Sequence, residues 1–293
     1  MSALTWKFKV LALFSRLVAK PAETLPPAQA RAQMRDAMSG PAFINGLAPA
    51  LASVRDDVVA GVRVRRYLPV AAEPGLLVYF HGGGWVYGDL DTHHIVVAQL
   101  AAATRREVVA VDYRLAPEHR YPAALDDAVA VIRALAGPRM VLAGDSAGGN
   151  LVAAAANQRV APIAAQVLVY PATDCVEERP SCAEFARGHV LTLEALRYFR
   201  REYVPDAAMR AEPGCSPIRA PSLEGVPPAY LLLAGCDVLR DEGREYAARL
   251  VSAGVETHVD EVPGVIHGFF GLQGLGEARS ALDRIVAWLE PRW

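Results

Sequence analysis

From residue 76 onward the sequence alternates short apolar segments with longer stretches of helical periodicity, and few architectures accommodate that order. The segment 76–80 is apolar throughout, as expected for a strand buried on both faces. Alternating strands and helices predict a mostly parallel α/β sheet with helices on both faces. The strands are expected at 58–68, 76–80, 108–113, 140–143, 163–170, 230–234 and 256–262, and the helices near 92–104, 122–136, 147–159, 240–253 and 277–289.

Two regions depart from this alternation and divide the 293 residues into parts. The interval 171–228 is too long for an ordinary connection and contains a helical segment near 193–203, so we expect a cap over the carboxyl ends of the strands, where open α/β folds bind ligands. The predicted organisation is N-terminal cap helices in 1–50, a first part of the catalytic core in 51–170, the cap insertion in 171–228 and a second part of the core in 229–293.

The N-terminal region contains a helix with one apolar stripe, followed by a second helical stretch at 28–38. The stripe has helical spacing and consists of Trp6, Val10, Leu13 and Leu17. We favour the interpretation that it packs on the rest of the protein or covers a pocket. The alternative is that it lies on a membrane surface, helped by Lys9, Arg16 and Lys20. Arg16 ends the apolar run too early for a secretory leader, so we expect mature protein here.

Charge balance, hydropathy and cysteine content limit the classes of function that this chain can have. The 30 basic and 32 acidic residues nearly balance, which gives no strong reason to expect nucleic-acid binding. No apolar stretch reaches the roughly 18 residues of a membrane-spanning helix, so no stable membrane insertion is expected. The four cysteines, Cys175, Cys182, Cys215 and Cys236, lack C-x-x-C spacing, so reduced thiols and a cytoplasmic location are expected.

The strongest motif is Gly-Asp-Ser-Ala-Gly-Gly at 144–149, between a predicted strand and a predicted Ala-rich helix. This is a G-x-S-x-G motif in the strand–turn–helix context that it requires. Glycine at 144 and 148 leaves room for a tight turn that exposes the hydroxyl of Ser146 at a helix N-terminus. The motif predicts a nucleophilic serine.

A second motif, His-Gly-Gly-Gly-Trp at 81–85, follows the apolar strand at 76–80. Consecutive glycines let backbone N–H groups approach a substrate oxygen, so this loop is a candidate oxyanion hole. The alternative of a phosphate-binding loop lacks the required Lys-Ser/Thr.

A serine nucleophile needs a base, and the base needs an orienting acid. His267 lies in a glycine-flanked loop near the C-terminus, and Asp237 follows an apolar strand, which makes them the favoured pair. Asp241, expected in a helix, and Asp260, expected in a strand, remain alternatives for the acid. Asp145 is interpreted as a local structural acceptor, and His93 and His94 as surface or capping residues.

These motifs together resemble the hormone-sensitive-lipase-like branch of the α/β-hydrolases, in particular bacterial esterases. The resemblance spans roughly residues 75–270 and rests on the motifs at 81–85, 113–119, 144–149, 237–243 and 267–269. It implies that Ser146 is the nucleophile, that His267 is the base and then the acid, and that Asp237 is its partner. It further implies an oxyanion hole formed by N–H groups of Gly83, Gly84 and Ala147, and a support role for His81. In the segment 113–119, Arg114 and Glu118 are expected to pair.

The expected function is a carboxylic ester hydrolase that works through an acyl-enzyme without cofactor or metal. Trp85 is expected to be a substrate-binding residue, and together with the cap it suggests a closed substrate pocket and short to medium acyl chains. Two alternatives remain open: a small-molecule receptor on the same fold, and cleavage of an amide, carbamate, lactone or thioester. The expected partner is a small ester substrate. The resemblance leaves a homodimer open, since relatives dimerise through edge elements near the C-terminus, but these residues do not determine the oligomeric state.

Overall fold

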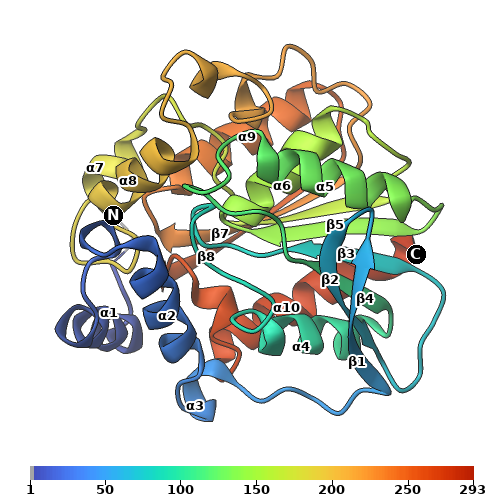
Figure 1. The fold of residues 1–293 in the computed structure, drawn as a ribbon, viewed down its shortest axis with the longest axis horizontal. Helices are drawn as coiled ribbons and strands as arrows, with labels where there is room; N and C mark the ends of the chain where they lie inside the picture. Colours follow the sequence, from blue (N-terminus) through green and yellow to red (C-terminus); the bar gives the residue numbers. More distant parts are fainter. Residues whose placement is uncertain (1–2) are drawn as a thin grey trace.

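The computed structural model describes residues 3–293 and is built around an eight-stranded sheet with the order β1-β2-β4-β3-β5-β6-β7-β8 (Figure 1). Neighbouring strands from β4 to β8 are parallel, whereas β1 and β2 add an antiparallel edge. The predicted α/β fold with a mostly parallel sheet is confirmed. The strands are β1 (Ser53–Val59), β2 (Val62–Leu68), β3 (Leu76–Phe80), β4 (Glu107–Val111), β5 (Met140–Asp145), β6 (Ala165–Val169), β7 (Ala229–Cys236) and β8 (Thr257–Ile266).

The expected single strand at 58–68 is wrong in its extent. The chain forms a hairpin there, in which β1 and β2 are joined by Ala60 and Gly61 at φ 51° and 81°. Two consecutive positive φ angles are characteristic of a tight two-residue hairpin turn. The turn was missed because Ala-Gly is a weaker signal than Asn-Gly, so the two strands appeared as one.

Helices cover both faces of the sheet (Figure 1). On one face α5, α6 and α9 pack over the parallel strands, and on the other face α4 and α10 do. Each face has its own buried apolar cluster, as expected for a sheet buried on both sides. The helices are α1 (Trp6–Val18), α2 (Pro27–Met38), α3 (Ala42–Asn45), α4 (His94–Thr104), α5 (Ala123–Ala134), α6 (Ala147–Asn157), α7 (Pro180–Glu184), α8 (Leu193–Tyr203), α9 (Arg240–Ser252) and α10 (Gly276–Leu289).

Two segments far apart in the sequence lie beside the carboxyl ends of β7 and β8. One contains α1 and α2, which precede the sheet, and the other contains α7 and α8, which lie between β6 and β7 (Figure 1). Helix α8 starts where the hydroxyl of Thr192 accepts a hydrogen bond from the Ala195 N–H at 3.1 Å, which is a standard N-terminal cap.

The favoured interpretation of the stripe on α1 is wrong. Phe8 and Ala12 are buried, but the stripe of Trp6, Val10, Leu13 and Leu17 faces solvent. Periodicity identified the apolar face correctly and could not say what lies against it. None of the helices within residues 3–293 is both long and apolar enough to span a bilayer.

Candidate active site

Ser146 lies in the tight turn between β5 and α6. Its backbone has φ 55° and ψ −116°, a conformation that persists only where its surroundings enforce it. A Cβ on Gly148 would collide with the carbonyl group of Phe80, and a Cβ on Gly144 would lie 2.5 Å from the carbonyl carbon of Gly148. The two glycines therefore make the turn possible, and the strand–turn–helix context expected for Ser146 is present.

The imidazole of His267 lies within hydrogen-bond distance of both Ser146 and Asp237. Its Nε2 is 2.9 Å from the Oγ of Ser146, and its Nδ1 is 2.7 Å from the Oδ2 of Asp237. The tautomer with the proton on Nδ1 satisfies both contacts: Nδ1–H donates to the carboxylate, and Nε2 accepts from the hydroxyl. The three residues directly follow the ends of β5, β7 and β8. The parallel sheet thus brings together side chains that are distant in the sequence.

The two alternative carboxylates are held elsewhere. Asp241 lies in the first turn of α9, where it contacts Arg240 and Arg244. Asp260 lies within β8 and accepts from Arg284 and from the hydroxyl of Tyr230. Neither contacts His267, whereas Asp237 is buried beside it and also accepts from the N–H of Leu239.

The glycine loop after β3 lies against the serine turn, since a Cβ on Gly148 would come within 2.7 Å of the carbonyl oxygen of His81. Gly83 and Gly84 have φ angles of 121° and 61°. A Cβ on Gly83 would lie 2.5 Å from the carbonyl oxygen of Tyr87, and a Cβ on Gly84 would overlap the ring of Phe199. Among the residues that the structure describes, the N–H groups of Gly83, Gly84 and Ala147 have no acceptor from the protein. They can donate to a developing negative charge.

Asp145, next to the serine, supports this loop. Its Oδ1 accepts from the N–H of Gly82 and from the hydroxyl of Tyr79, both at 2.8 Å. His81 lies beside it, with Nδ1 2.8 Å from the carbonyl oxygen of Gly82, and burial lowers the pKa of His81 to about 4. An imidazole that is neutral at neutral pH donates one hydrogen bond here and adds no charge behind the loop.

His93 occupies the N-cap position of α4, one of the two roles expected for it, but its side chain makes no capping bond and it is not a surface residue. Its side chain is buried, and its Nε2 lies 3.5 Å from the Oδ1 of Asp145. Burial alone would raise the pKa of Asp145, but the neighbouring His93 and the hydroxyl of Tyr79 outweigh that effect, so its pKa lies below the usual range. The sequence shows only two consecutive histidines at the start of a helix, and this pattern does not predict that one of the two side chains is buried.

Trp85 lies at the contact between the glycine loop and α8. Its ring is 1% exposed and stacks on Tyr203, with centroids 4.4 Å apart and an angle of 3° between the planes. Phe199, one turn earlier on α8, packs against Gly84 and meets Tyr87 edge to face. Sequence analysis missed both α8 aromatics, although Leu196, Phe199 and Tyr203 follow helical spacing.

Arg31 on α2 joins the N-terminal helices to the same region. Its guanidinium donates to the carbonyl oxygens of Val86 and Ala116 at 2.8 and 2.9 Å, and it pairs with both oxygens of Glu118. The expected pair of Arg114 and Glu118 is therefore wrong.

Arg114 instead pairs with Asp127 of α5. The residue spacing within 113–119 gave no information about partners on either α2 or α5.

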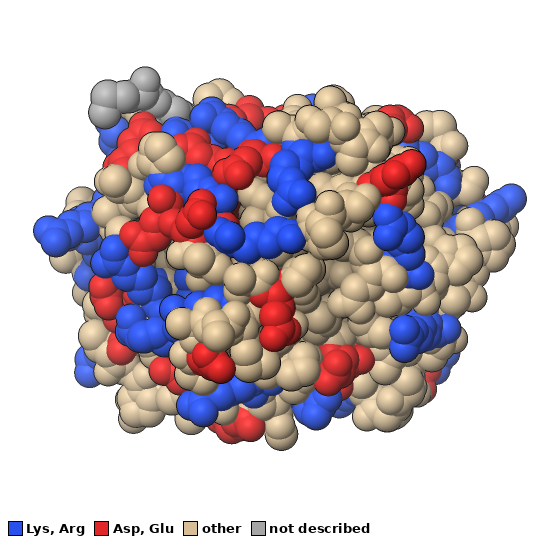
Figure 2. Space-filling model, turned by 90° about the horizontal axis from the view of Figure 1, so that it is seen from above, with Lys and Arg blue, Asp and Glu red and all other residues tan. Residues whose placement is uncertain are grey.

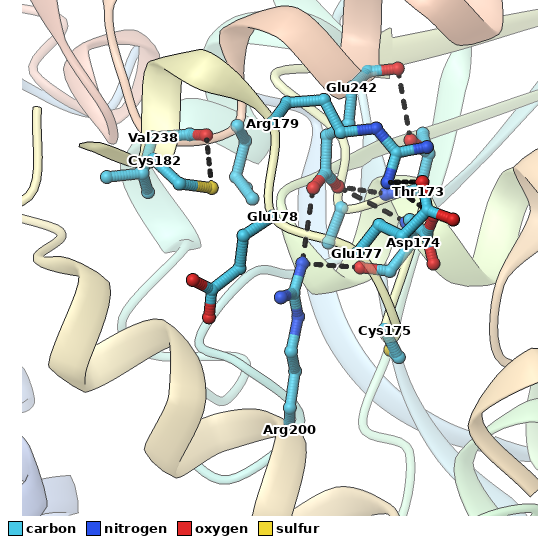
Figure 3. Close-up of polar contacts among 12 residues, drawn as sticks. Thr173, Asp174, Cys175, Glu177, Glu178, Arg179, Cys182, Arg200, Val238 and Glu242 are labelled. Carbon is cyan, nitrogen blue, oxygen red and sulfur yellow. Dashed lines mark hydrogen bonds and ion pairs between the residues drawn. The ribbon is translucent and has the colours of Figure 1, made fainter. Parts of the chain in front are cut away.

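A buried charged cluster connects α8 to α9 and to the segment after β6 (Figure 3). Arg200 reaches from α8 to the carboxylate of Glu242 on α9 at 3.2 Å and to the carbonyl oxygen of Asp174. Glu242 also accepts from the N–H of Thr173 at 2.6 Å. Burial raises the pKa of Glu242 to about 7, although Arg200 and the backbone donors oppose that change.

The segment that precedes this cluster is bonded to the serine turn. The N–H of Ala172 donates to the carbonyl oxygen of Ser146 at 3.2 Å, and Asn150 donates to the carbonyl oxygen of Ala172 at 2.9 Å. The chain from Ser146 to α8 is thus a continuous series of buried polar contacts.

On the face seen in Figure 2, basic and acidic side chains are interspersed, and neither sign forms a large continuous patch. Within residues 3–293, no group of His, Cys, Asp and Glu side chains is arranged to hold a metal ion. The four cysteines are buried and unbridged, as expected.

The comparisons with known proteins agree with this geometry. Residues 77–271 match a family described as alpha/beta hydrolase fold. The chain is 42% identical over 222 residues to esterase LipI of Mycobacterium tuberculosis, which covers 71% of this chain and 69% of that protein. It is 37% identical over 246 residues to an ethyl acetate hydrolase of Pseudomonas putida, with coverages of 78% and 77%. The hyperthermophilic esterase from the archaeon Pyrobaculum calidifontis superimposes with a TM-score of 0.92 at 31% identity, covering 99% of this chain and 98% of the other. The chain belongs to the hormone-sensitive-lipase-like carboxylesterase family of the α/β-hydrolases.

Proposed function

We propose that this chain hydrolyses carboxylic esters of short to medium acyl chain through an acyl-enzyme on Ser146. His267 acts as base and then acid, and Asp237 orients it. The N–H groups of Gly83, Gly84 and Ala147 form the oxyanion hole. The observation that carries the proposal is the position of the His267 ring between the Ser146 hydroxyl and the Asp237 carboxylate, at 2.9 and 2.7 Å.

In the first half of the reaction, the Oγ of Ser146 attacks the acyl carbon while its proton moves to the Nε2 of His267. The former carbonyl oxygen becomes an oxyanion held by the backbone donors. The bond from carbon to the alcohol oxygen then breaks, and the alcohol leaves with the proton from His267. The acyl group remains on Ser146.

In the second half, water attacks the acyl-enzyme and gives a proton to His267. The second oxyanion collapses, the bond to Ser146 Oγ breaks, and His267 returns the proton to the serine. The products are a carboxylic acid and free enzyme, so neither a cofactor nor a metal ion is needed. Asp237 stabilises the imidazolium that forms in each half.

Ser146→Ala is the direct test of the nucleophile. The variant should lose turnover of a soluble aryl ester by a factor on the order of 10⁶. An organophosphonate should add covalently to the wild-type protein and leave the variant unlabelled, as measured by intact-protein mass spectrometry. Thermal unfolding should be nearly unchanged, because the hydroxyl contributes one hydrogen bond. Near-normal turnover in the variant contradicts the assignment.

The proposed acyl preference is supported by the aromatic contacts over the glycine loop. Trp85, Tyr203 and Phe199 pack together where a long acyl chain would need an open groove. We therefore propose that the N-terminal helices and the segment 171–228 form a cap over Ser146. A series of 4-nitrophenyl esters should give kcat/KM that falls steeply beyond medium chain length, whereas a preference for emulsified long-chain triglyceride contradicts it.

The proposed location is the cytoplasm. The four buried, unbridged thiols suit a reducing compartment and give no support to a disulfide framework.

A further inference from the structure

Helix α1 has two opposite apolar faces, and the fold uses one of them. Phe8 and Ala12 are buried against the rest of the molecule. The opposite face, which we call the α1 outer face, is exposed. Because successive helical residues are rotated by about 100°, the residues of this face form one continuous stripe along the helix. The α1 outer face consists of Trp6, Val10, Leu13, Phe14 and Leu17, which are 72%, 57%, 57%, 61% and 76% exposed.

Charge on α1 is of one sign. Between residues 3 and 22 the sequence has four basic residues and no acidic residue. Lys9 and Arg16 flank one side of the α1 outer face, Lys20 lies just after the C-terminal end of the helix, and all three are exposed. Lys7 flanks the other side and pairs with Glu277 of α10 at 3.1 Å. An apolar stripe bordered by cations is complementary to a surface with anionic headgroups above an apolar interior.

The contacts of α1 keep this face outward. The N–H of Thr5 donates to the carbonyl oxygen of Gly264 on β8 at 3.0 Å, which fixes the start of the helix. Phe8 is 0% exposed and belongs to the same buried cluster as Ile266 and Phe269. Turning the outer face inward would expose Phe8 and break the contact with Gly264.

We propose that α1 is a membrane-docking helix that binds reversibly to the surface of an anionic phospholipid bilayer. The α1 outer face enters the boundary between headgroups and acyl chains, and Lys9, Arg16 and Lys20 contact the phosphates. At about 1.5 Å per residue, the helix is roughly 20 Å long and lies in the interface without spanning it. Docking through a second copy of the chain is disfavoured because it would bring the same cations together.

This placement orients the protein on the bilayer. Figure 1 shows α1 on the side of the molecule that also holds α2, α7 and α8, beside the carboxyl ends of β7 and β8. A bound helix α1 therefore places the Ser146 side of the sheet near the lipid surface. Esters that partition into the interface would reach the site over a short distance.

Vesicle binding tests the proposal with the full chain. The wild-type protein should sediment with vesicles that contain phosphatidylglycerol, and binding should fall as salt is raised, because exposed charges are screened within about 10 Å at 0.1 M. Vesicles of phosphatidylcholine alone should bind far less. The emission of Trp6 should shift to shorter wavelength on binding, and Trp6→Phe should abolish that shift.

Variants separate the apolar and the charged contributions. Leu13→Asp/Leu17→Asp should abolish sedimentation, and Lys9→Gln/Arg16→Gln should weaken it by about 25-fold, at roughly fivefold per basic residue. Val251→Asp on α9 and Arg133→Gln on α5 change equally exposed side chains away from α1 and should bind like wild type. All variants should keep the far-UV circular dichroism spectrum and the thermal unfolding midpoint of the wild type, which shows that they fold.

Several results would overturn the proposal. One is a wild-type protein that does not sediment with anionic vesicles, and another is binding that survives in Leu13→Asp/Leu17→Asp. A dimer in sedimentation velocity that dissociates in this variant, without any vesicle binding, would assign the α1 outer face to a second copy. None of these results depends on whether Ser146 is the nucleophile.

Discussion

Gly84 is constrained both by its own backbone and by a neighbour. Its φ of 61° lies in the left-handed region, which an alanine adopts at a cost of roughly 1–2 kcal/mol. Its Cβ position is also filled by the ring of Phe199 on α8. A side chain at this position would have to move either the glycine loop or helix α8.

We expect Gly84→Ala to lower kcat by on the order of 10²-fold, because a displacement of about 1 Å at a reacting group has that effect. Gly254→Ala is the matched control: φ is 76° there, and no atom lies within 4 Å of the Cβ position. The control should lose some stability and keep its kcat. Steady-state kinetics with a soluble ester measures both, and an equal loss of kcat in the two variants would argue against the contact with Phe199.

The local geometry around single residues was the most predictable level. Ser146 sits in a local strand–turn–helix pattern whose glycines are required by sterics, so the sequence within a few positions is sufficient. The pairing of Arg114 was not predictable, because its partner Asp127 lies on a helix whose position depends on the whole sheet.

Arg31 joins helix α2 to the main chain just after the glycine loop. Arg31 donates to the carbonyl oxygens of Val86 and Ala116, which are main-chain groups, and its ion pair with Glu118 is half exposed. Exposed ion pairs contribute little to stability, whereas hydrogen bonds from a charged donor to partly buried carbonyls contribute more. The carbonyl contacts should therefore anchor α2.

Arg31→Ala should lower the free energy of unfolding by about 2 kcal/mol and raise KM, because Val86 lies two residues after Gly84 of the glycine loop. Glu118→Gln removes the ion pair and leaves the carbonyl contacts, so it should change stability by less than about 1 kcal/mol. Urea unfolding and steady-state kinetics of both variants show whether the carbonyl contacts or the ion pair anchor α2. A larger effect from Glu118→Gln than from Arg31→Ala would show that the ion pair is the anchor.

Secondary-structure elements were predictable where their hydrophobic pattern is continuous. The apolar segment 76–80 is a strand with the expected ends, and 193–203 is a helix with the expected ends. The hairpin of β1 and β2 was missed because its turn, Ala60-Gly61, has no strong turn signal. The stripe on α1 was recognised, but its exposure depends on which face the rest of the molecule covers.

Across the whole molecule, the buried cluster around Glu242 links parts that are far apart in the sequence. Glu242 on α9 contacts Arg200 on α8 and the segment after β6, and it is 0% exposed. No sequence pattern predicted this cluster. Each contact joins residues on different elements, and the relative positions of these elements are defined only in the complete sheet.

The raised pKa of Glu242 makes stability depend on pH. Its pKa rises from 4.5 to about 7 on folding, so between these values the folded protein binds more protons than the unfolded chain at this site. Stability should therefore fall as pH rises from about 4.5 to about 7, by at most roughly 1.4 kcal/mol per pH unit from this group, and level off above.

Glu242→Gln should remove this pH dependence, because the amide does not titrate. The urea midpoint measured at intervals between about pH 5 and pH 8 should vary less in the variant than in wild type over the lower part of the range. Glu224→Gln changes an exposed carboxylate and serves as the control. Parallel pH profiles for wild type and Glu242→Gln would refute the role of Glu242.

The contact between Thr5 and Gly264 joins the first helix to the last strand of the sheet. The ribosome makes Gly264 about 260 residues after Thr5, which at 5–20 residues per second is an interval of tens of seconds. During translation, the side of α1 that contains Phe8 has no strand to dock on, so the nascent chain displays apolar residues on both sides of this helix. Such a segment is a natural binding site for a chaperone, and this enzyme should depend on one until β8 has left the ribosome.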